Sequence, residues 1–200
     1  MFTGIIKNLG KIKRIAGTKL AIETDTEFCA KLEIGASIAV NGICLTVTVF
    51  DKSSFTVEIM PETVKRTNLQ YLRTGDEANL EMPTTGESFL AGHIVQGHID
   101  GIARLQSMVD DGNSRMLKFT VDETLTKYIV EKGSIAINGV SLTVIEAGSN
   151  YFTVGIIPHT WDATMFHNFK TGDFANVEVD VLAKYIERLI SYRAPNKKNG

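Results

Sequence analysis

Hydrophobic and polar residues alternate one by one along much of the chain, in short runs separated by turn-forming residues. Residues 55–59 read FTVEI and residues 177–181 read VEVDV, so every second side chain is apolar. A period of two is that of a strand with one buried face. Asn-Gly pairs at 41–42 and 138–139 favour tight hairpin turns, because both residues tolerate positive φ. Many short strands with frequent turns predict an all-β chain built from small antiparallel barrels.

The chain also repeats itself at an offset of 97 residues. Residues 37–47 read SIAVNGICLTV and residues 134–144 read SIAINGVSLTV. Between 37–81 and 134–178, 21 of 45 positions are identical without a gap. The same offset aligns Gly4-Ile5 with Gly101-Ile102. The sequence therefore predicts two copies of one module.

A different pattern follows the second copy. Apolar residues stand at positions 181, 182, 185, 186, 189 and 190, which is the spacing of an amphipathic helix. Two interpretations stay open: the helix packs on its own barrel, or it joins chains in an oligomer. Segments around 26–34 and 123–131 are richer in helix formers and predict a short helix in each copy.

A length of 200 residues allows one domain or two, and the repeat favours two. We expect a first barrel over residues 1–97, a second over 98–182, a helix over 183–192 and a disordered tail over 193–200. The hydrophobic content of 44% argues against a disordered chain. A net charge of -2 gives no electrostatic reason to expect nucleic acid or an anionic membrane as a partner.

Cysteine usage and targeting signals point to the cytoplasm. Two cysteines without paired spacing indicate a reducing compartment. No apolar run approaches the length of a membrane span, and the first residues do not resemble a signal peptide. We therefore expect a cytoplasmic protein without a membrane partner.

A duplicated barrel predicts two similar pockets, which suits chemistry between two copies of one molecule. The pockets differ in several polar groups at matched positions: Cys44 against Ser141, Glu62 against His159, Gly35 against Lys132, and Met1 against His98. Such differences fit a donor and an acceptor molecule, and they fit simple divergence equally well.

The common catalytic motifs are absent from the sequence. It contains no phosphate-binding Gly-rich loop, Cys-x-x-Cys pair or nucleophile elbow. His93 and His98 are five residues apart, a poor spacing for metal, so a structural role is favoured and no metal site is expected. Cys44 lies in an apolar run and fits a small core residue. Lys132 beside Gly133 fits a solvated turn.

Several motifs together nevertheless resemble one family. The opening MFTGI, the runs NGICLTV at 41–47 and NGVSLTV at 138–144, and the Gly-His pairs at 92–93 and 97–98 resemble the riboflavin synthase α-chain family. The resemblance spans about residues 1–190. It implies two six-stranded Greek-key barrels and a terminal helix that joins three chains into a trimer. It also implies a site formed between the first barrel of one chain and the second barrel of its neighbour.

The reaction that the resemblance implies joins two molecules of 6,7-dimethyl-8-ribityllumazine. A four-carbon unit passes from one to the other, giving riboflavin and 5-amino-6-(ribitylamino)uracil, with no cofactor and no metal. An association of the homotrimer with lumazine synthase stays open. Carried over residue by residue, the substrate contacts fall on Gly4, Ile5, Ile6, Cys44, Leu45, Thr46, Glu58, Ile59, Met60, Pro61, Glu62, Thr63, Gly97, His98, Ile99, Lys132, Ser141, Leu142, Thr143, Gly155, Ile156, Ile157, Pro158, His159 and Thr160.

Five of these residues are expected to act in the chemistry. Ser141 and Thr143 would bind and polarise the donor lumazine, while Cys44, with Thr46, would hold the acceptor. His98 is the expected proton shuttle, because the imidazole group titrates near neutral pH. Lys132 would stabilise negative charge on the ring or contact the ribityl chain.

One position departs from the family pattern, and two other interpretations compete: a lumazine carrier, and a structural pair of barrels without a ligand, against which the matched pocket-wall motifs argue. Relatives commonly carry aspartate where this chain has Asn138, and an amide cannot act as a base. A turn role for the Asn138-Gly139 pair is the alternative. Fluorescent antenna proteins resemble this family and carry lumazine without converting it. Both the Cys44 and the Ser141 motifs are intact here, which favours the enzyme.

Overall fold

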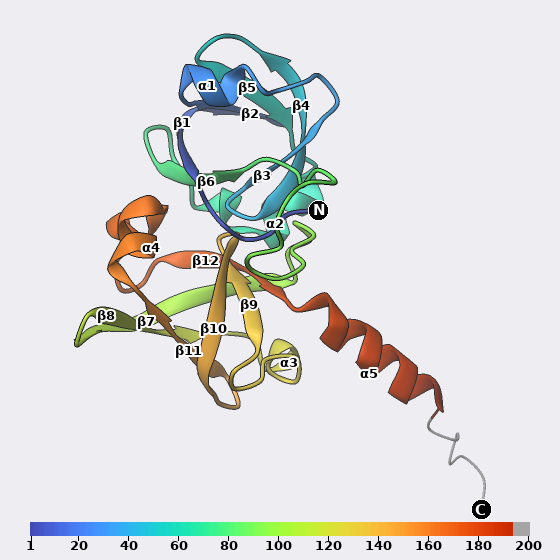
Figure 1. Ribbon diagram of the computed structural model, residues 1–200, viewed down its shortest axis with the longest axis vertical. Helices are drawn as coiled ribbons and strands as arrows, with labels where there is room; N and C mark the ends of the chain where they lie inside the picture. The colour runs from blue at the N-terminus through green and yellow to red at the C-terminus, as the bar shows by residue number, and fades with distance from the viewer. Residues whose placement is uncertain (194–200) are drawn as a thin grey trace, which may run out of the picture.

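The chain forms two closed β-barrels, one above the other, with a helix that extends away from them (Figure 1). This is a computed structural model, and it describes residues 1–193. Each barrel has six antiparallel strands. The all-β prediction with a C-terminal helix is confirmed.

The first barrel is closed in the order β1-β2-β5-β4-β3-β6. Connections between β2 and β3 and between β5 and β6 pass over an end of the barrel, as in a Greek key. Its elements are β1 (Asn8–Ala16), β2 (Lys19–Glu23), α1 (Thr26–Cys29), β3 (Ser37–Val40), β4 (Ile43–Phe50), β5 (Ser54–Glu58), α2 (Pro61–Arg66), η1 (Asn68–Gln70) and β6 (Glu77–Glu81).

The second barrel repeats this arrangement in the order β10-β11-β8-β7-β12-β9. Its elements are β7 (Gly101–Asp111), β8 (Ser114–Thr120), α3 (Glu123–Thr126), β9 (Ser134–Ile137), β10 (Val140–Ala147), β11 (Tyr151–Ile156), α4 (Pro158–Ala163), η2 (Met165–Asn168) and β12 (Phe174–Val179). The helices expected around 26–34 and 123–131 are present, but α1 and α3 are only four residues long.

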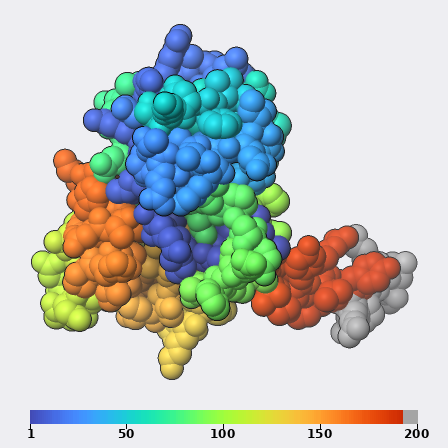
Figure 2. Space-filling view, turned by 45° about the horizontal axis from the view of Figure 1, so that its top comes forward, coloured from blue at the N-terminus to red at the C-terminus, as the bar shows by residue number. Residues whose placement is uncertain are grey.

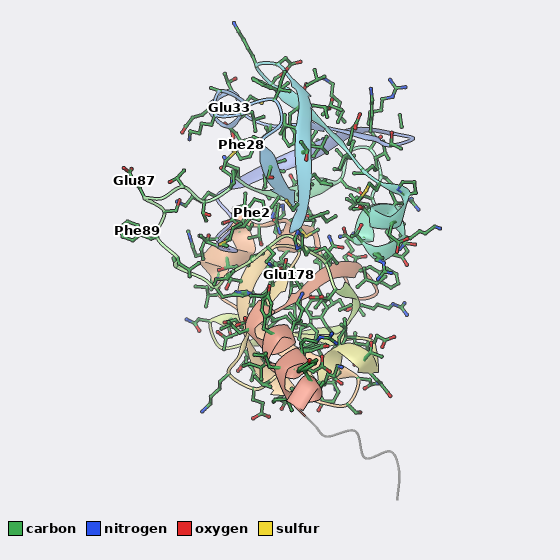
Figure 3. All side chains as sticks on the ribbon, turned by 90° about the vertical axis from the view of Figure 1, so that its right-hand side faces the viewer. Phe2, Phe28, Glu33, Glu87, Phe89 and Glu178 are labelled. Atoms are coloured by element: carbon green, nitrogen blue, oxygen red, sulfur yellow. The ribbon has the colours of Figure 1, made fainter. Side chains whose placement is uncertain are left out.

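Alternation along the strands divides each barrel into a core and an outer face. In β4, Ile43, Leu45 and Val47 are buried, while Thr46 between them is exposed. Each barrel has its own apolar core. A third, smaller cluster around Phe2 and Val95 lies between the barrels, and Figure 3 places Phe2 at that junction.

The repeat is not uniform in three dimensions. Asn8 pairs with Leu80 in the first barrel, whereas Gly101 pairs with Val177 in the second. The equivalent residues are therefore 93 apart in β1 and β7 and 97 apart in β6 and β12. The β7–β8 hairpin is four residues longer than the β1–β2 hairpin, which accounts for the change. The sequence alignment of Gly4-Ile5 with Gly101-Ile102 is therefore wrong.

The two Asn-Gly turns meet back to back on the pseudo-twofold axis. Asn41 and Asn138 are fully buried and adopt φ of 46° and 47°. A Cβ on Gly42 would lie 2.6 Å from the backbone nitrogen of Gly139, so the two turns touch through their backbones. Each turn carbonyl accepts a hydrogen bond from across the interface: Asn79 Nδ2 donates to Asn138 O (2.9 Å), and Asn176 Nδ2 donates to Asn41 O (2.8 Å).

This arrangement explains the amide at position 138. Its Oδ1 accepts the backbone N–H of Asn176 (2.8 Å) and a bond from Asn68 Nδ2 (3.1 Å), while its Nδ2 approaches Met165 Sδ (3.3 Å). The side chain is fully buried, with one hydrogen bond from Asn68 of the first barrel and two contacts within the second barrel. Asn138 therefore has a structural role in the joint between the barrels.

Helix α5 (Val181–Arg193) touches its own barrel along one side only. Its Glu187 accepts bonds from Lys127 and Tyr128, and its Lys184 pairs with Asp100 at 2.7 Å. Figure 2 shows the helix projecting sideways from the body of the two barrels. Large apolar side chains on it are more than half exposed: Leu182, Tyr185, Ile186, Leu189, Ile190 and Tyr192. The tail expected over 193–200 lies, apart from Arg193, outside the described residues.

Among residues 1–193, no helix has the length and hydropathy that a membrane span requires.

Candidate functional site

Most predicted contact residues of the first copy lie on the outer face of the first barrel, but the side chains of Leu45 and Ile59 are buried in its core, so their prediction as substrate contacts is wrong for the side chains. Cys44 and Thr46 point outward from β4, and Thr46 pairs with Glu58 of β5. The chain then continues through the exposed Met60 into α2. We call this surface, made by Cys44–Thr46 and Glu58–Thr63, the Cys44 half-site.

The second barrel presents the equivalent surface, although the side chain of Ile156, another predicted contact, is buried in the core. Ser141 and Thr143 point outward from β10, beside Gly155 at the end of β11 and the exposed Ile157 before α4. We call this surface, made by Ser141–Thr143 and Gly155–Thr160, the Ser141 half-site.

Two arms cross between the barrels and complete the half-sites. The N-terminal arm (residues 2–6) precedes the first barrel but reaches the second, where Gly4 O accepts the N–H of Ser141 at 2.8 Å. The linker arm (residues 95–99) reaches back to the first, where Gly97 O accepts the N–H of Cys44 at 2.9 Å. The arms are held together by paired hydrogen bonds between Phe2 and Val95 (2.7 and 3.1 Å).

Glycine is required where each arm meets its half-site. Gly4 and Gly97 have φ of 76° and 82°. A Cβ on Gly4 would lie 2.6 Å from Ser141 Cβ, and a Cβ on Gly97 would lie 2.5 Å from Cys44 Cβ. The structure thus brings Gly4–Ile6 to Ser141 and Gly97–Ile99 to Cys44. Each arm therefore contributes to the half-site on the barrel that it does not lead into.

The hydrophobic residues of the arms follow the same crossing. Ile6 packs in the core cluster of the second barrel, and Ile99 packs against that of the first. His98 is the structural equivalent of Ile5, so the match of His98 with Met1 that a constant offset predicts is wrong.

One buried carboxylate anchors each arm. Glu81, at the end of β6, accepts the N–H groups of Thr3 (2.7 Å) and Gly4 (3.0 Å). Glu178, in β12, accepts those of Gln96 (2.6 Å) and Gly97 (2.9 Å). Burial raises the pKa of both carboxyl groups, and the accepted hydrogen bonds partly oppose that rise.

A histidine to which the sequence assigns no chemistry lies against Ser141. His93 Nδ1 is 2.7 Å from Ser141 Oγ, and its Nε2 has no hydrogen-bond partner within the described residues. The ring is 8% exposed. Burial lowers the pKa of His93, with a smaller opposing effect from the charge of Asp180, so the neutral ring is favoured. Spacing could not reveal this contact, because 48 residues separate the two side chains.

The other two expected chemical groups lie at the edges of the half-sites. His98 is exposed, and its backbone N–H donates to Glu178 Oε2 at 3.1 Å. Lys132 is exposed in a turn with φ of 62°, and its N–H donates to Val144 O. Glu62 forms a 2.5 Å ion pair with Arg66, and its repeat equivalent His159 is exposed.

Two cavities of the single chain lie away from Cys44 and Ser141, and a smaller one of about 330 Å³ is lined in part by Ile156 and Pro158 of the Ser141 half-site. A cavity of about 750 Å³ lies between the barrels beside Tyr71 and Phe174, and one of about 480 Å³ lies under α5. Neither is lined by Cys44 or Ser141. Among residues 1–193, no group of three or more His, Cys, Asp or Glu side chains is arranged to hold a metal ion.

Comparisons with known proteins agree with the division into two barrels. The model of the lumazine binding domain family matches residues 3–83 and 96–180, one match for each barrel. Riboflavin synthase from Actinobacillus pleuropneumoniae is 42% identical over 193 residues, covering 95% of this chain and 90% of the relative. Riboflavin synthase from Bacillus subtilis is 41% identical, covering 98% and 93%. The chain belongs to the riboflavin synthase family.

Solved structures support the fold of this family member. LumP complexed with riboflavin has a TM-score of 0.83 at 24% identity and covers 90% of this chain and 99% of LumP. LumP complexed with 6,7-dimethyl-8-(1'-D-ribityl) lumazine has a TM-score of 0.81 at 23% identity. At this identity the likeness concerns the architecture of the paired barrels.

Proposed function

We propose that this member of the riboflavin synthase family converts two molecules of 6,7-dimethyl-8-ribityllumazine into riboflavin and 5-amino-6-(ribitylamino)uracil. The observation that carries the proposal is the pair of half-sites, which have the same backbone and different polar groups. Ser141 has a buried histidine behind it, and Cys44 has no such partner among the described residues. Two similar surfaces suit two copies of one substrate, and the polar difference suits unequal roles.

The Ser141 half-site is proposed to provide the proton transfers. The 7-methyl group of the lumazine is acidic, because its carbanion delocalises into the ring. Ser141 Oγ takes that proton while passing its own to His93 Nδ1, which burial keeps neutral and able to accept it. Thr143, two residues along the same face of β10, is proposed to hold the ring. His98 serves later proton transfers from the edge of the Cys44 half-site.

Holding two rings face to face provides much of the remaining acceleration. A bimolecular encounter becomes effectively unimolecular, which lowers the barrier by roughly 7–11 kcal/mol in favourable cases. Cys44 and Thr46 are proposed to hold the acceptor ring, with Lys132 near the ribityl chain or the charged ring of the donor.

The complete site is proposed to form between neighbouring chains of a homotrimer. Each half-site is an open outer face, and an open face leaves a bound ring exposed to water. The apolar side chains of Leu182, Ile186 and Ile190 on helix α5 are more than half exposed. Such an apolar surface fits packing between chains. Replacing Ile186 and Ile190 with Glu should convert a trimer to monomers in light-scattering chromatography and abolish turnover. A wild-type monomer with full turnover would contradict this arrangement.

The cytoplasm is the proposed compartment. Cys29 and Cys44 are both free thiols, which fits a reducing environment.

A carrier that holds lumazine without converting it is the competing function, supported by the likeness to ligand-bound LumP. Purified protein incubated with 6,7-dimethyl-8-ribityllumazine separates the two, because riboflavin formation is followed directly by its absorbance. Binding without product would favour the carrier.

Variants then assign the groups. Ser141→Ala should lower kcat by about 100-fold, the usual contribution of a positioned acid or base, and His93→Gln should lower it similarly. Ser107→Ala, in β7 outside both half-sites, is the matched control. Full turnover in Ser141→Ala and His98→Ala together would contradict the roles assigned here.

A further inference from the structure

Two glutamates outside the proposed chemistry occupy equivalent places at the junction of the barrels. Glu81 ends β6 and Glu178 lies in β12, and they are 9% and 1% exposed. Figure 3 places Glu178 beside the linker between the barrels, near Phe2. Burying a carboxylate is unfavourable unless it is well hydrogen-bonded. The backbone N–H groups that donate to each carboxylate therefore indicate its structural role.

Glu178 is connected to Cys44 through the linker arm. Its Oε1 accepts the N–H of Gln96 at 2.6 Å, and its Oε2 accepts those of Gly97 at 2.9 Å and His98 at 3.1 Å. Gly97 O in turn accepts the N–H of Cys44 at 2.9 Å. A residue of the second barrel thereby fixes one wall of the half-site on the first.

Glu81 makes the reciprocal connection through the N-terminal arm. Its Oε1 accepts the N–H and the hydroxyl of Thr3, both at 2.7 Å, and its Oε2 accepts the N–H of Gly4 at 3.0 Å. Gly4 O accepts the N–H of Ser141 at 2.8 Å. A residue of the first barrel thereby fixes one wall of the half-site on the second.

We propose that Glu81 and Glu178 are positioning residues, and that each controls ligand binding at the half-site of the opposite barrel. The proposal rests on the proposed function, because it assumes that both half-sites bind a ribityl-substituted ring. Every contact of the two carboxylates described above goes to an arm. Each arm has a glycine against its half-site with no room for a Cβ, so a small displacement moves the wall directly.

Glutamine is the informative substitution, because it keeps the shape of the side chain. Only one of its two terminal atoms accepts hydrogen bonds, and its amino group faces an N–H of the arm. In Glu178→Gln the bonds to Gln96, Gly97 and His98 cannot all be kept. The arm loosens while the barrel cores stay unchanged.

Ligand binding at one half-site at a time tests the crossing. Riboflavin, the proposed product, serves as the probe by its fluorescence, and a bulky Phe at Ser141 or at Cys44 blocks the corresponding half-site. In the Ser141→Phe background, Glu178→Gln should weaken riboflavin binding about tenfold, since the charge-assisted bonds that hold the wall are lost. In the Cys44→Phe background, Glu178→Gln should change riboflavin binding less than twofold. Glu81→Gln should show the opposite pattern.

Amide hydrogen exchange tests the same connection without any ligand. Glu178→Gln should speed exchange at residues 96–98 and at Cys44 and leave Ser141 unchanged, and Glu81→Gln should do the reverse. Glu23→Gln, an exposed carboxylate of β2, is the control and should change neither. This measurement separates a local change from general unfolding, which would raise exchange throughout the barrel cores.

The outcomes are distinct. Loss of affinity at the opposite half-site, with faster exchange in the matching arm, supports the proposal. Loss at the half-site of the same barrel, or unchanged affinity at both, overturns it while leaving the proposed function in place. Wild-type protein that binds no riboflavin at either half-site overturns the proposed function and this proposal with it.

Discussion

The contact between the two Asn-Gly turns can be tested with a single methyl group. Gly42 has φ of 76°, and a Cβ there would lie 2.6 Å from Gly139 N and 2.8 Å from Gly139 Cα. Both neighbours are backbone atoms, so no side chain can rotate away. Gly42→Ala should therefore push the barrels apart at their joint.

Gly17 offers a matched comparison, since its φ is 57° and, among residues 1–193, no atom apart from its chain neighbours lies within 4 Å of the place that a Cβ would occupy. Left-handed backbone costs an alanine about 1–2 kcal/mol at either site. Overlap in a packed interface adds roughly 1–3 kcal/mol at Gly42 alone. We expect Gly17→Ala to lower the free energy of unfolding by about 1 kcal/mol and Gly42→Ala by about 3 kcal/mol.

Thermal unfolding followed by circular dichroism measures the difference. For a chain of this size, about 1 kcal/mol lowers Tm by roughly 2–4 °C. The Tm of Gly17→Ala should then fall by about that amount, and the Tm of Gly42→Ala by roughly three times as much. Equal losses in the two variants would refute the reasoning, because the barrels would then have room to accept a methyl group on the axis.

Three further changes test other contacts. Burial lowers the pKa of His93 from its ordinary 6.5, so the free energy of unfolding should fall as pH drops through and below that value; His93→Gln should flatten the fall in denaturant titrations. Phe2→Ala removes a fully buried ring between the barrels and should cost about 3–5 kcal/mol in urea unfolding; a loss under about 1 kcal/mol would contradict its anchoring role. Asp25 caps α1 by accepting the N–H of Phe28 at 2.7 Å, so Asp25→Ala should lower the free energy of unfolding by about 1 kcal/mol. An unchanged midpoint of urea unfolding would contradict this capping role.

Much of the fold could be predicted from the sequence because its signals are local. Alternation marks which face of a strand is buried, and the Asn-Gly pairs mark hairpins, as at Asn41 and Asn138. The repeat is long enough to set the number of barrels. The amphipathic pattern of α5 predicts a helix but not its exposure, since exposure depends on how the helix leaves the barrel.

The half-sites were predictable only in part, because they depend on contacts between distant segments. The repeat identifies Cys44 and Ser141 as equivalents, but a constant offset conceals that Gly4 corresponds to Gly97. The four additional residues of the β7–β8 hairpin change the offset between equivalent residues before the hairpin. They leave the offset after it unchanged. The Gly-His pair at 92–93 marks the family resemblance but does not say what His93 contacts, so its contact with Ser141 is evident only in three dimensions.

The crossing of the arms has a consequence for how such a chain arises. Two identical barrels that exchange their leading segments across a twofold axis have an isologous contact, the form in which a symmetric dimer of single modules would meet. Joining two such modules end to end preserves every contact at the axis, including the facing turns at Gly42 and Gly139. In such a chain the linker between the barrels needs only to span the gap between two modules. A joined pair also allows the two copies to differ in sequence, as they do here at Ser141, which contacts His93, and at Cys44.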